Sequence, residues 1–345
     1  MAKYKIFFGT YSKGPGNGVF SGEFDAETGA VSLGKTFDIE NPSYLQLNDN
    51  ILYGVAELNN WENENGGALF SVDAAEMKLI DVKCTHGRSP CHLWLKDNFV
   101  FVSNYSEGSL SIFKADKSGN IEPSLQSIHH FGNSVNQGRQ KQSHVHFAAM
   151  TPDNKYLALC DLGMDKVFLY PYYSSPYHAE LNGLATSAKI IDCPPGAGPR
   201  HLTFSKCGGY LYVLEEMGNA VLAYKYDGLE FLQEISTLPE DFTGVSHCAA
   251  IHVSPDGKLL AASNRGHDSL AVYKIKENGG LEFLTHIMTG KEPRDFRFSP
   301  DGNWLLAGNQ NSDSVTVFKI EGDNFIKTSD ISLPKPVCIL FGGKV

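Results

Sequence analysis

The sequence lacks the features of several large protein classes. It has no long unbroken apolar run, so we expect no transmembrane helix and no membrane partner. We expect no signal peptide, because the sequence runs almost directly into the strand-like segment Ile6–Tyr11. Positive charge is scarce, because 29 Lys and Arg stand against 39 Asp and Glu and give a net charge of −10. No basic patch is visible, which argues against a nucleic-acid partner.

Paired cysteine motifs are also missing. The seven cysteines are odd in number and contain no CxxC pair, and Cys84 and Cys91 have the wrong spacing for a structural zinc pair. We therefore expect buried free thiols and a cytoplasmic location. The sequence also lacks a nucleophile elbow, a Walker loop and an HExxH motif, which removes three common kinds of catalytic site.

The residues that are present favour strands and turns. Hydrophobic residues make up 42% of the 345 positions, aromatic residues 11%, and there are 34 glycines. This is enough apolar material for a large core and excludes wholesale disorder. The length alone leaves two domains or one large closed architecture open.

An internal repeat decides between these architectures. An alternating apolar run recurs seven times, at Val19–Asp25, Ala68–Asp73, Leu110–Lys114, Val167–Tyr170, Val221–Lys225, Leu270–Lys274 and Val315–Lys319. Turn sequences such as Ser254–Gly257 and Ser299–Gly302 precede the neighbouring strand in several units. A repeat of about 49 residues is typical of a propeller blade. The sequence predicts an all-β, seven-bladed β-propeller with four-stranded antiparallel blades.

The two ends of the chain complement each other. Pro336–Phe341 reads as an innermost strand without the rest of its blade, and Ile6–Tyr11 reads as a second strand without its first. Pairing them would remove two open edges, so we predict one domain over residues 1–345, closed by its terminal strands. Two segments exceed the repeat, about Ala115–Ser143 and Pro171–Gly198, and we expect them to shape a rim.

Polar residues interrupt the starts of the predicted inner strands. Taken singly, His92, His201 and His252 read as residues that solvate a wet channel. Four other residues look less ordinary together, because they fall at strand ends on one side of the ring: His146, Arg200, Glu216 and Arg265. Two arginines, a histidine and a carboxylate around a cavity suit an anionic small molecule.

Two other interpretations of these residues stay open. The arginines and the glutamate could form ion pairs that join neighbouring blades. His144 and His146 alternate, so a strand would place both on one face, with Phe147 on the other, and a two-histidine metal site is conceivable. Alternation also implies that only one of Glu215 and Glu216 faces the channel.

The sequence resembles a known family at these residues. It is similar over nearly its whole length to the seven-bladed propeller lactonases of the bacterial 6-phosphogluconolactonase type and to the fungal carboxy-cis,cis-muconate cyclases. The matching motifs are Arg139-Gln140 with His144–His146, Thr151–Asp153 with Asp161–Gly163, Gly198–Leu202 with Glu216, Ile251-His252 with Asn264-Arg265, and Pro293-Arg294 with Gly308–Gln310.

The resemblance implies a site and a reaction. His146 and Glu216 would be catalytic, while Arg200 and Arg265 would bind the substrate. Arg139, His201 and Arg294 stand in matching motifs and His92 opens an inner strand, so all four are further candidate substrate-binding residues. The implied reaction is hydrolysis of 6-phosphoglucono-1,5-lactone, an anionic sugar lactone of the pentose phosphate pathway. The resemblance also implies that no metal or organic cofactor is required. The alternatives are chemistry on another anionic lactone, such as a carboxymuconolactone, and a non-enzymatic interaction propeller.

Overall fold

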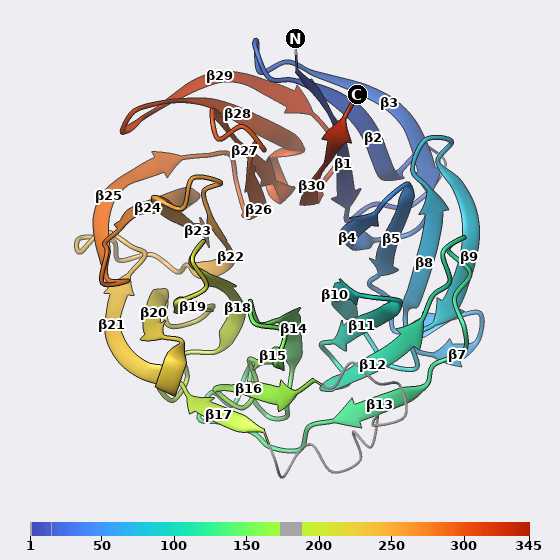
Figure 1. The fold of residues 1–345 in the computed structure, drawn as a ribbon, viewed down its shortest axis with the longest axis horizontal. Helices are drawn as coiled ribbons and strands as arrows, with labels where there is room; N and C mark the ends of the chain where they lie inside the picture. The colour runs from blue at the N-terminus through green and yellow to red at the C-terminus, as the bar shows by residue number, and fades with distance from the viewer. Residues whose placement is uncertain (1, 15, 173–187) are drawn as a thin grey trace.

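The computed structural model describes residues 2–14, 16–172 and 188–345. Seven four-stranded antiparallel sheets stand around a central channel as the blades of a ring (Figure 1). The prediction of a seven-bladed propeller is thus confirmed. Helical structure in the described residues is limited to the short 3-10 turns η3 (Asp227–Leu229) and η4 (Gln310–Ser312), and no described helix could span a membrane.

The strands of each blade follow here from the channel outward. Blade 1 contains β30 (Pro336–Lys344), β1 (Lys3–Thr10), β2 (Gly18–Asp25) and β3 (Val31–Asp38). Blade 2 contains β4 (Pro42–Asn48), β5 (Ile51–Ala56), β8 (Ala68–Asp73) and β9 (Lys78–Cys84). Blade 3 contains β10 (Pro90–Lys96), β11 (Phe99–Asn104), β12 (Ser109–Lys114) and β13 (Gln126–His129). Blade 4 contains β14 (Val145–Met150), β15 (Tyr156–Asp161), β16 (Lys166–Pro171) and β17 (Lys189–Asp192).

The remaining blades have the same order. Blade 5 contains β18 (Pro199–Phe204), β19 (Tyr210–Glu215), β20 (Ala220–Lys225) and β21 (Glu230–Ser236). Blade 6 contains β22 (His247–Val253), β23 (Leu259–Arg265), β24 (Ser269–Ile275) and β25 (Leu281–Met288). Blade 7 contains β26 (Pro293–Phe298), β27 (Trp304–Asn309), β28 (Ser314–Glu321) and β29 (Asn324–Ser332). A separate hairpin, β6 (Asn60–Trp61) with β7 (Glu64–Asn65), interrupts the connection from β5 to β8.

The ring closes through its two ends, as the sequence predicts. β1 pairs antiparallel with β30, and the register sets Phe8 opposite Ile339. The two termini therefore lie side by side in one blade (Figure 1). Among the described residues the buried apolar side chains form seven clusters, such as the one that joins Tyr4 and Phe8 of blade 1 to Leu306 of blade 7. The apolar face of each sheet is thereby buried against the next blade.

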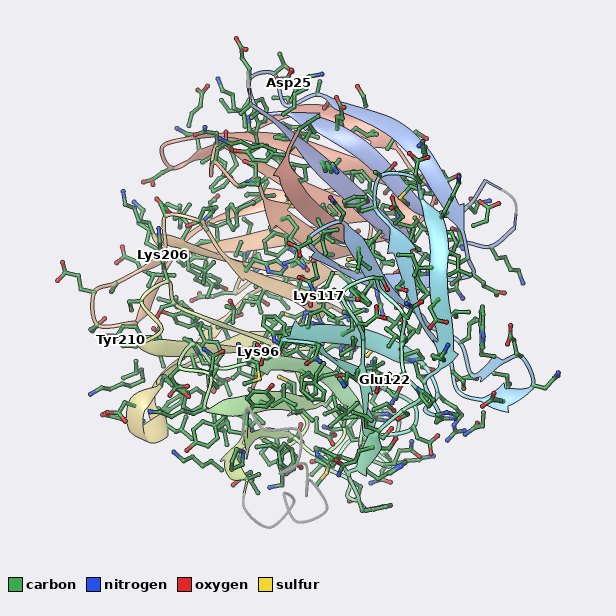
Figure 2. All side chains as sticks on the ribbon, turned by 45° about the vertical axis from the view of Figure 1, so that its right-hand side comes forward. Asp25, Lys96, Lys117, Glu122, Lys206 and Tyr210 are labelled. Atoms are coloured by element: carbon green, nitrogen blue, oxygen red, sulfur yellow. The ribbon has the colours of Figure 1, made fainter. Side chains whose placement is uncertain are left out.

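The predicted turns lie at one end of the channel, between the first and second strands. In blade 6 the Ser254 hydroxyl donates to Asp256 Oδ1 at 2.6 Å and accepts from the Leu259 backbone N–H at 2.9 Å. Three residues labelled in Figure 2 belong to this same end: Lys96 is the last residue of β10, and Lys117 and Lys206 lie in loops. The inner strands begin at the opposite end, which we call the channel mouth.

The structure describes the two segments that exceed the repeat to different extents. In the first, residues 130–144 form a loop after β13 that brings Arg139 to the channel mouth, in agreement with the expected rim. The central part of the second, residues 173–187, lies outside the described residues.

Candidate active site at the channel mouth

Every inner strand carries a register shift near its first residue. In blade 5, for example, Pro199 pairs with Glu215 and His201 pairs with Leu214, so Arg200 is an extra residue. Such a β-bulge turns one side chain away from the regular alternation. The residues in this position around the ring are Ser43, Cys91, His146, Arg200, Ala249 with Ala250, Arg294 and Val337. Five of them, Ser43, Cys91, Arg200, Arg294 and Val337, help to line a narrow pocket at the mouth, which His146 does not line.

Glu216 is the centre of one side of the mouth. Its carboxylate lies between three guanidinium groups: Arg139 Nη2 at 2.6 Å, Arg200 Nε at 3.0 Å and Arg265 Nη2 at 3.1 Å. The backbone holds the residue in place, since Glu216 N–H donates to Gly198 O at 2.7 Å and Glu216 O accepts from Cys248 N–H at 2.8 Å. Three of the four predicted core residues therefore converge, and Arg139 joins them.

Positive charge dominates the electrostatics of the cluster around Glu216. Burial acts to raise the pKa of Glu216, but the charges of Arg265 and Arg200 outweigh it and hold the pKa well below the usual range. Burial together with the nearby charges of Arg294 and Arg265 lowers the pKa of Arg200 to about 10. The arginines around Glu216 carry more positive charge than its single carboxylate neutralises. This surplus favours the binding of an added anion.

Arg294 defines the other side of the mouth. Its Nη2 donates to the Tyr11 hydroxyl at 2.7 Å, and Tyr11 donates in turn to Glu57 Oε2 at 2.6 Å. The guanidinium also lies 4.9 Å from the centre of the Tyr11 ring. Tyr11, Glu57 and Arg294 all line the same pocket as Arg200. The pocket thus has an arginine on each side.

His146, the predicted base, lies beside this cluster and is almost fully buried. Burial and the charge of Arg200 hold its pKa well below the ordinary histidine value, so the imidazole is neutral at pH 7. Its Nδ1 has no hydrogen-bond partner in the described part of the chain, and no hydrogen bond or ion pair between described residues joins it to Glu216. An unpaired buried nitrogen costs free energy, so a water molecule or a ligand that donates to Nδ1 would be favourable here.

The adjacent glutamates have different surroundings. Glu216 meets the arginines, whereas Glu215 is buried away from them, with the Glu215 carboxylate against the backbone of Gly218. Burial, with the negative charges of Glu234 and Asp165, raises the pKa of Glu215 to about 8. The predicted alternation therefore holds at this pair, and Glu216 is the one at the mouth.

One residue further along four neighbouring inner strands lies a second layer, which we call the aromatic layer. It consists of Tyr44, His92, Phe147 and His201, whose rings lie in contact, with centroids from 4.1 Å (Tyr44 to His92) to 6.4 Å (Tyr44 to His201) apart. His92 is fully buried and does not line the pocket, so the structure gives this predicted substrate-binding residue a packing position instead. His201 does line the pocket, and its Nε2 accepts from Arg200 Nη1 at 3.1 Å.

The bulge overturns one prediction from alternation. Phe147 was expected to face away from His146, but both rings contact His201, at centroid distances of 5.0 and 5.3 Å. His144 lies just before β14; its backbone N–H donates to Asp161 and its ring stacks on Tyr105. The prediction failed because the extra residue of the β-bulge interrupts the alternation of side chains at the start of β14.

Sequence reasoning missed Tyr11, Glu57 and Tyr105. Each follows directly after a second strand, the position that Glu216 occupies in blade 5. Tyr105 accepts from Arg139 Nη2 at 3.3 Å and presents its ring edge to His146. Applying the blade 5 position to every repeat would have identified all three.

Comparison with known proteins agrees with this architecture. Residues 5–341 match the family model described as "Lactonase, 7-bladed beta-propeller". A 6-phosphogluconolactonase of Bacillus subtilis is 34% identical, over 99% of each chain. A 6-phosphogluconolactonase of Formosa agariphila is also 34% identical, over 84% of this chain and 85% of the relative. The solved structure of a periplasmic gluconolactonase of Pseudomonas aeruginosa superposes with a TM-score of 0.88 at 29% identity, covering 99% of each chain.

Proposed function

The chain belongs to the seven-bladed β-propeller lactonase family, and from that premise we propose that it hydrolyses 6-phosphoglucono-1,5-lactone to 6-phosphogluconate at the channel mouth. The relatives from Bacillus and Formosa carry this name, whereas the Pseudomonas protein is named for an unphosphorylated lactone. The choice between these substrates has to come from the site itself.

The charge of the mouth is the observation that carries the proposal. Arg139, Arg200, Arg265 and Arg294 provide four positive charges, and Glu216 and Glu57 provide two negative charges. Two positive charges are left over, in a protein whose net charge is −10. A phosphate monoester carries close to two negative charges at neutral pH. The surplus is therefore matched to a phosphorylated lactone better than to a neutral one.

The chemistry requires a base and an oxyanion binder. Water attacks the lactone carbonyl, a carbon–oxygen bond forms, and the water proton passes to neutral His146. An arginine of the Glu216 cluster donates to the oxyanion of the tetrahedral intermediate, and another holds the phosphate. The ring carbon–oxygen bond then breaks, and the proton on His146 passes to the leaving oxygen. The product is the open hydroxy acid.

Glu216 acts as a positioning residue in this mechanism. Both carboxylate oxygens of Glu216 are engaged by arginines, whereas His146 Nδ1 has no hydrogen-bond partner among the described residues, so His146 is better placed to take the water proton. Its role is to fix the planes of Arg139, Arg200 and Arg265. The mouth thereby offers fixed donors before the substrate arrives, and such preorganisation is a large part of electrostatic catalysis.

A lactone-opening assay tests the proposal. Purified protein is mixed with freshly prepared 6-phosphogluconolactone, acid release is followed, and the spontaneous rate is subtracted. We expect acceleration that disappears in Arg200→Met while the melting temperature shows a folded protein. A carboxymuconolactone serves as the second substrate. Turnover of that compound alone would assign the site to the other anionic lactone, and no turnover of either would favour an interaction propeller.

We also propose a cytoplasmic location. Six of the seven cysteines are buried free thiols, which suits a reducing compartment. Fractionation of cells that express the full-length protein tests this proposal, since recovery in a periplasmic or extracellular fraction would contradict it.

A further inference from the structure

A second group of chemically active side chains lies outside the channel mouth. Among the described residues, Glu64, Cys84 and His86 bring three ligand atoms within 4.8 Å of one another. Glu64 belongs to β7, Cys84 ends β9, and His86 lies in the connection to β10. We propose that these three side chains form a binding site for a divalent transition-metal ion of the zinc class.

The spacing of the ligand atoms suits tetrahedral coordination. His86 Nδ1 and Glu64 Oε2 are 3.5 Å apart. Zinc–ligand bonds of about 2.0–2.2 Å at tetrahedral angles place a nitrogen and an oxygen ligand about 3.4 Å apart. The Cys84 sulfur completes the triangle, and its distance of 3.8 Å to Asn65 O leaves that carbonyl or a water for the fourth position. Only small side-chain movements are needed to bring all donors onto one ion.

The donor types select the ion. One thiolate, one imidazole and one carboxylate are the ligand classes that zinc accepts, whereas calcium and magnesium require oxygen ligands throughout. Binding replaces the proton of the Cys84 thiol, which is released to solvent, so the charge of the site balances as metal enters. Neither oxidant nor reductant takes part.

The backbone around the site is fixed without the metal. Thr85 N–H donates to Gly67 O at 2.9 Å, and Gly67 N–H donates to Gly87 O at 3.1 Å. Gly66 has no space for a side chain, because a Cβ there would lie 2.9 Å from His86 N and 3.1 Å from Cys84 Sγ. The hairpin β6–β7 and the end of β9 are thus packed against each other, which lowers the entropy cost of assembling the ligands.

The site differs from an ordinary surface ion pair in its third member. Glu64 and His86 alone are about half exposed and would contribute little as a pair. Cys84 is buried beneath them, and its sulfur accepts from His86 N–H at 3.4 Å. Since the β5–β8 connection that contains this hairpin begins at Glu57, a metal here would also fix one part of the rim of the mouth.

Cobalt(II) provides a direct probe, because a thiolate ligand gives it a charge-transfer absorption in the near ultraviolet. Full-length protein, kept reduced by a phosphine that does not bind metal, is titrated with cobalt and then with zinc. We expect the band to saturate at one equivalent and to vanish as zinc displaces cobalt. Zinc should also raise the melting temperature of the wild type.

Matched variants identify the ligands. Cys84→Ala should lose the band, and His86→Ala and Glu64→Gln, which alter exposed side chains, should weaken cobalt binding at least about 10-fold. Cys207→Ser removes the exposed cysteine elsewhere and should leave the band unchanged. A missing band in the wild type, or a full band in His86→Ala, would overturn the proposal. These readouts do not involve lactone turnover, so they stand or fall separately from the proposed function.

Discussion

Two layers of the same channel, the mouth and the layer below it, have opposite electrostatic designs. At the mouth, Arg139, Arg200, Arg265 and Arg294 outnumber the carboxylates of Glu216 and Glu57. Below it, charges cancel. Asp295 Oδ1 accepts from His252 Nε2 at 3.2 Å, His252 Nδ1 accepts from Arg297 at 3.0 Å, and Asp295 lies 3.7 Å from Arg297.

The difference separates function from structure within one set of strands. In the lower layer each charge has a partner, and the remaining space holds the rings of Tyr44, His92 and Phe147. Such a layer closes the channel and stabilises the ring. At the mouth the positive charges exceed the carboxylates, and His146 Nδ1 has no hydrogen-bond partner among the described residues. Balanced charges therefore indicate the scaffold, and a surplus of positive charge indicates the candidate site.

The largest expected effect is on turnover. His146→Ala should lower kcat by about 10²–10⁴-fold, because the water proton loses its acceptor. The matched change below the mouth, His92→Ala, should lower the melting temperature and leave kcat of the folded fraction near the wild type. Steady-state kinetics and thermal melts of both variants measure this. Wild-type kcat in folded His146→Ala would remove the histidine from the mechanism.

The next effect is on stability and contrasts two neighbouring residues. Glu216→Gln leaves three buried or partly buried arginines without their anion and should destabilise the protein by about 3–5 kcal/mol. Glu215→Gln should cost less than about 1 kcal/mol at pH 7, because the pKa of Glu215 is raised to about 8 and its carboxyl is already mostly neutral. Denaturant melts at pH 7 compare the two. Equal losses would contradict the different charge states assigned to them.

A smaller effect concerns substrate binding. Arg294→Met should raise KM for the phosphorylated lactone about 10–100-fold, the equivalent of one charge-assisted hydrogen bond, with kcat largely retained. Arg297→Met, in the balanced layer, should reduce stability and leave KM of the folded fraction unchanged. Kinetics at several substrate concentrations give both constants. A KM change in Arg297→Met as large as that in Arg294→Met would erase the distinction between the layers.

The smallest effect is the change in the free energy of unfolding for each unit of pH. Burial and Arg297 lower the pKa of His252 to about 4, so the unfolded chain binds a proton at higher pH than the folded chain. Stability should therefore fall as pH drops from 6.5 toward 4, by about 1.4 kcal/mol per pH unit for this residue. His252→Gln should be less stable at pH 7 but should lose less on acidification. The exposed His129→Gln is the control, and an unchanged slope in His252→Gln would contradict the buried neutral histidine.

Much of the fold was predictable because the repeat is expressed in local chemistry. The seven apolar runs coincide with the third strands, and the Ser-Pro-Asp-Gly turns lie where hairpin geometry demands them. The closure by β1 and β30 followed from the incomplete blades at the ends of the chain. Periodicity and turn chemistry depend on residues that are close in the chain, so they can be recognised in a single sequence.

The site was less predictable, because two of its features, the β-bulges and a contact from an inserted loop, depend on residues far apart in the chain. The bulges at Arg200 and His146 place consecutive residues on the same side of the channel, which no alternating pattern reveals. The partner of Glu216 from the inserted loop, Arg139, comes from 77 residues away. The charge surplus depends on which arginines share one carboxylate, and only the assembled ring determines that.

Substrate selectivity tests the central claim most directly. The kcat/KM of the wild type for 6-phosphogluconolactone is compared with that for gluconolactone, which differs only in lacking the phosphate. The surplus of positive charge predicts a preference of at least about 10-fold for the phosphorylated lactone, reduced by added salt and lost in Arg294→Met. Equal efficiency toward the two lactones, insensitive to salt, would contradict the assignment of the channel mouth as a phosphate-recognising site.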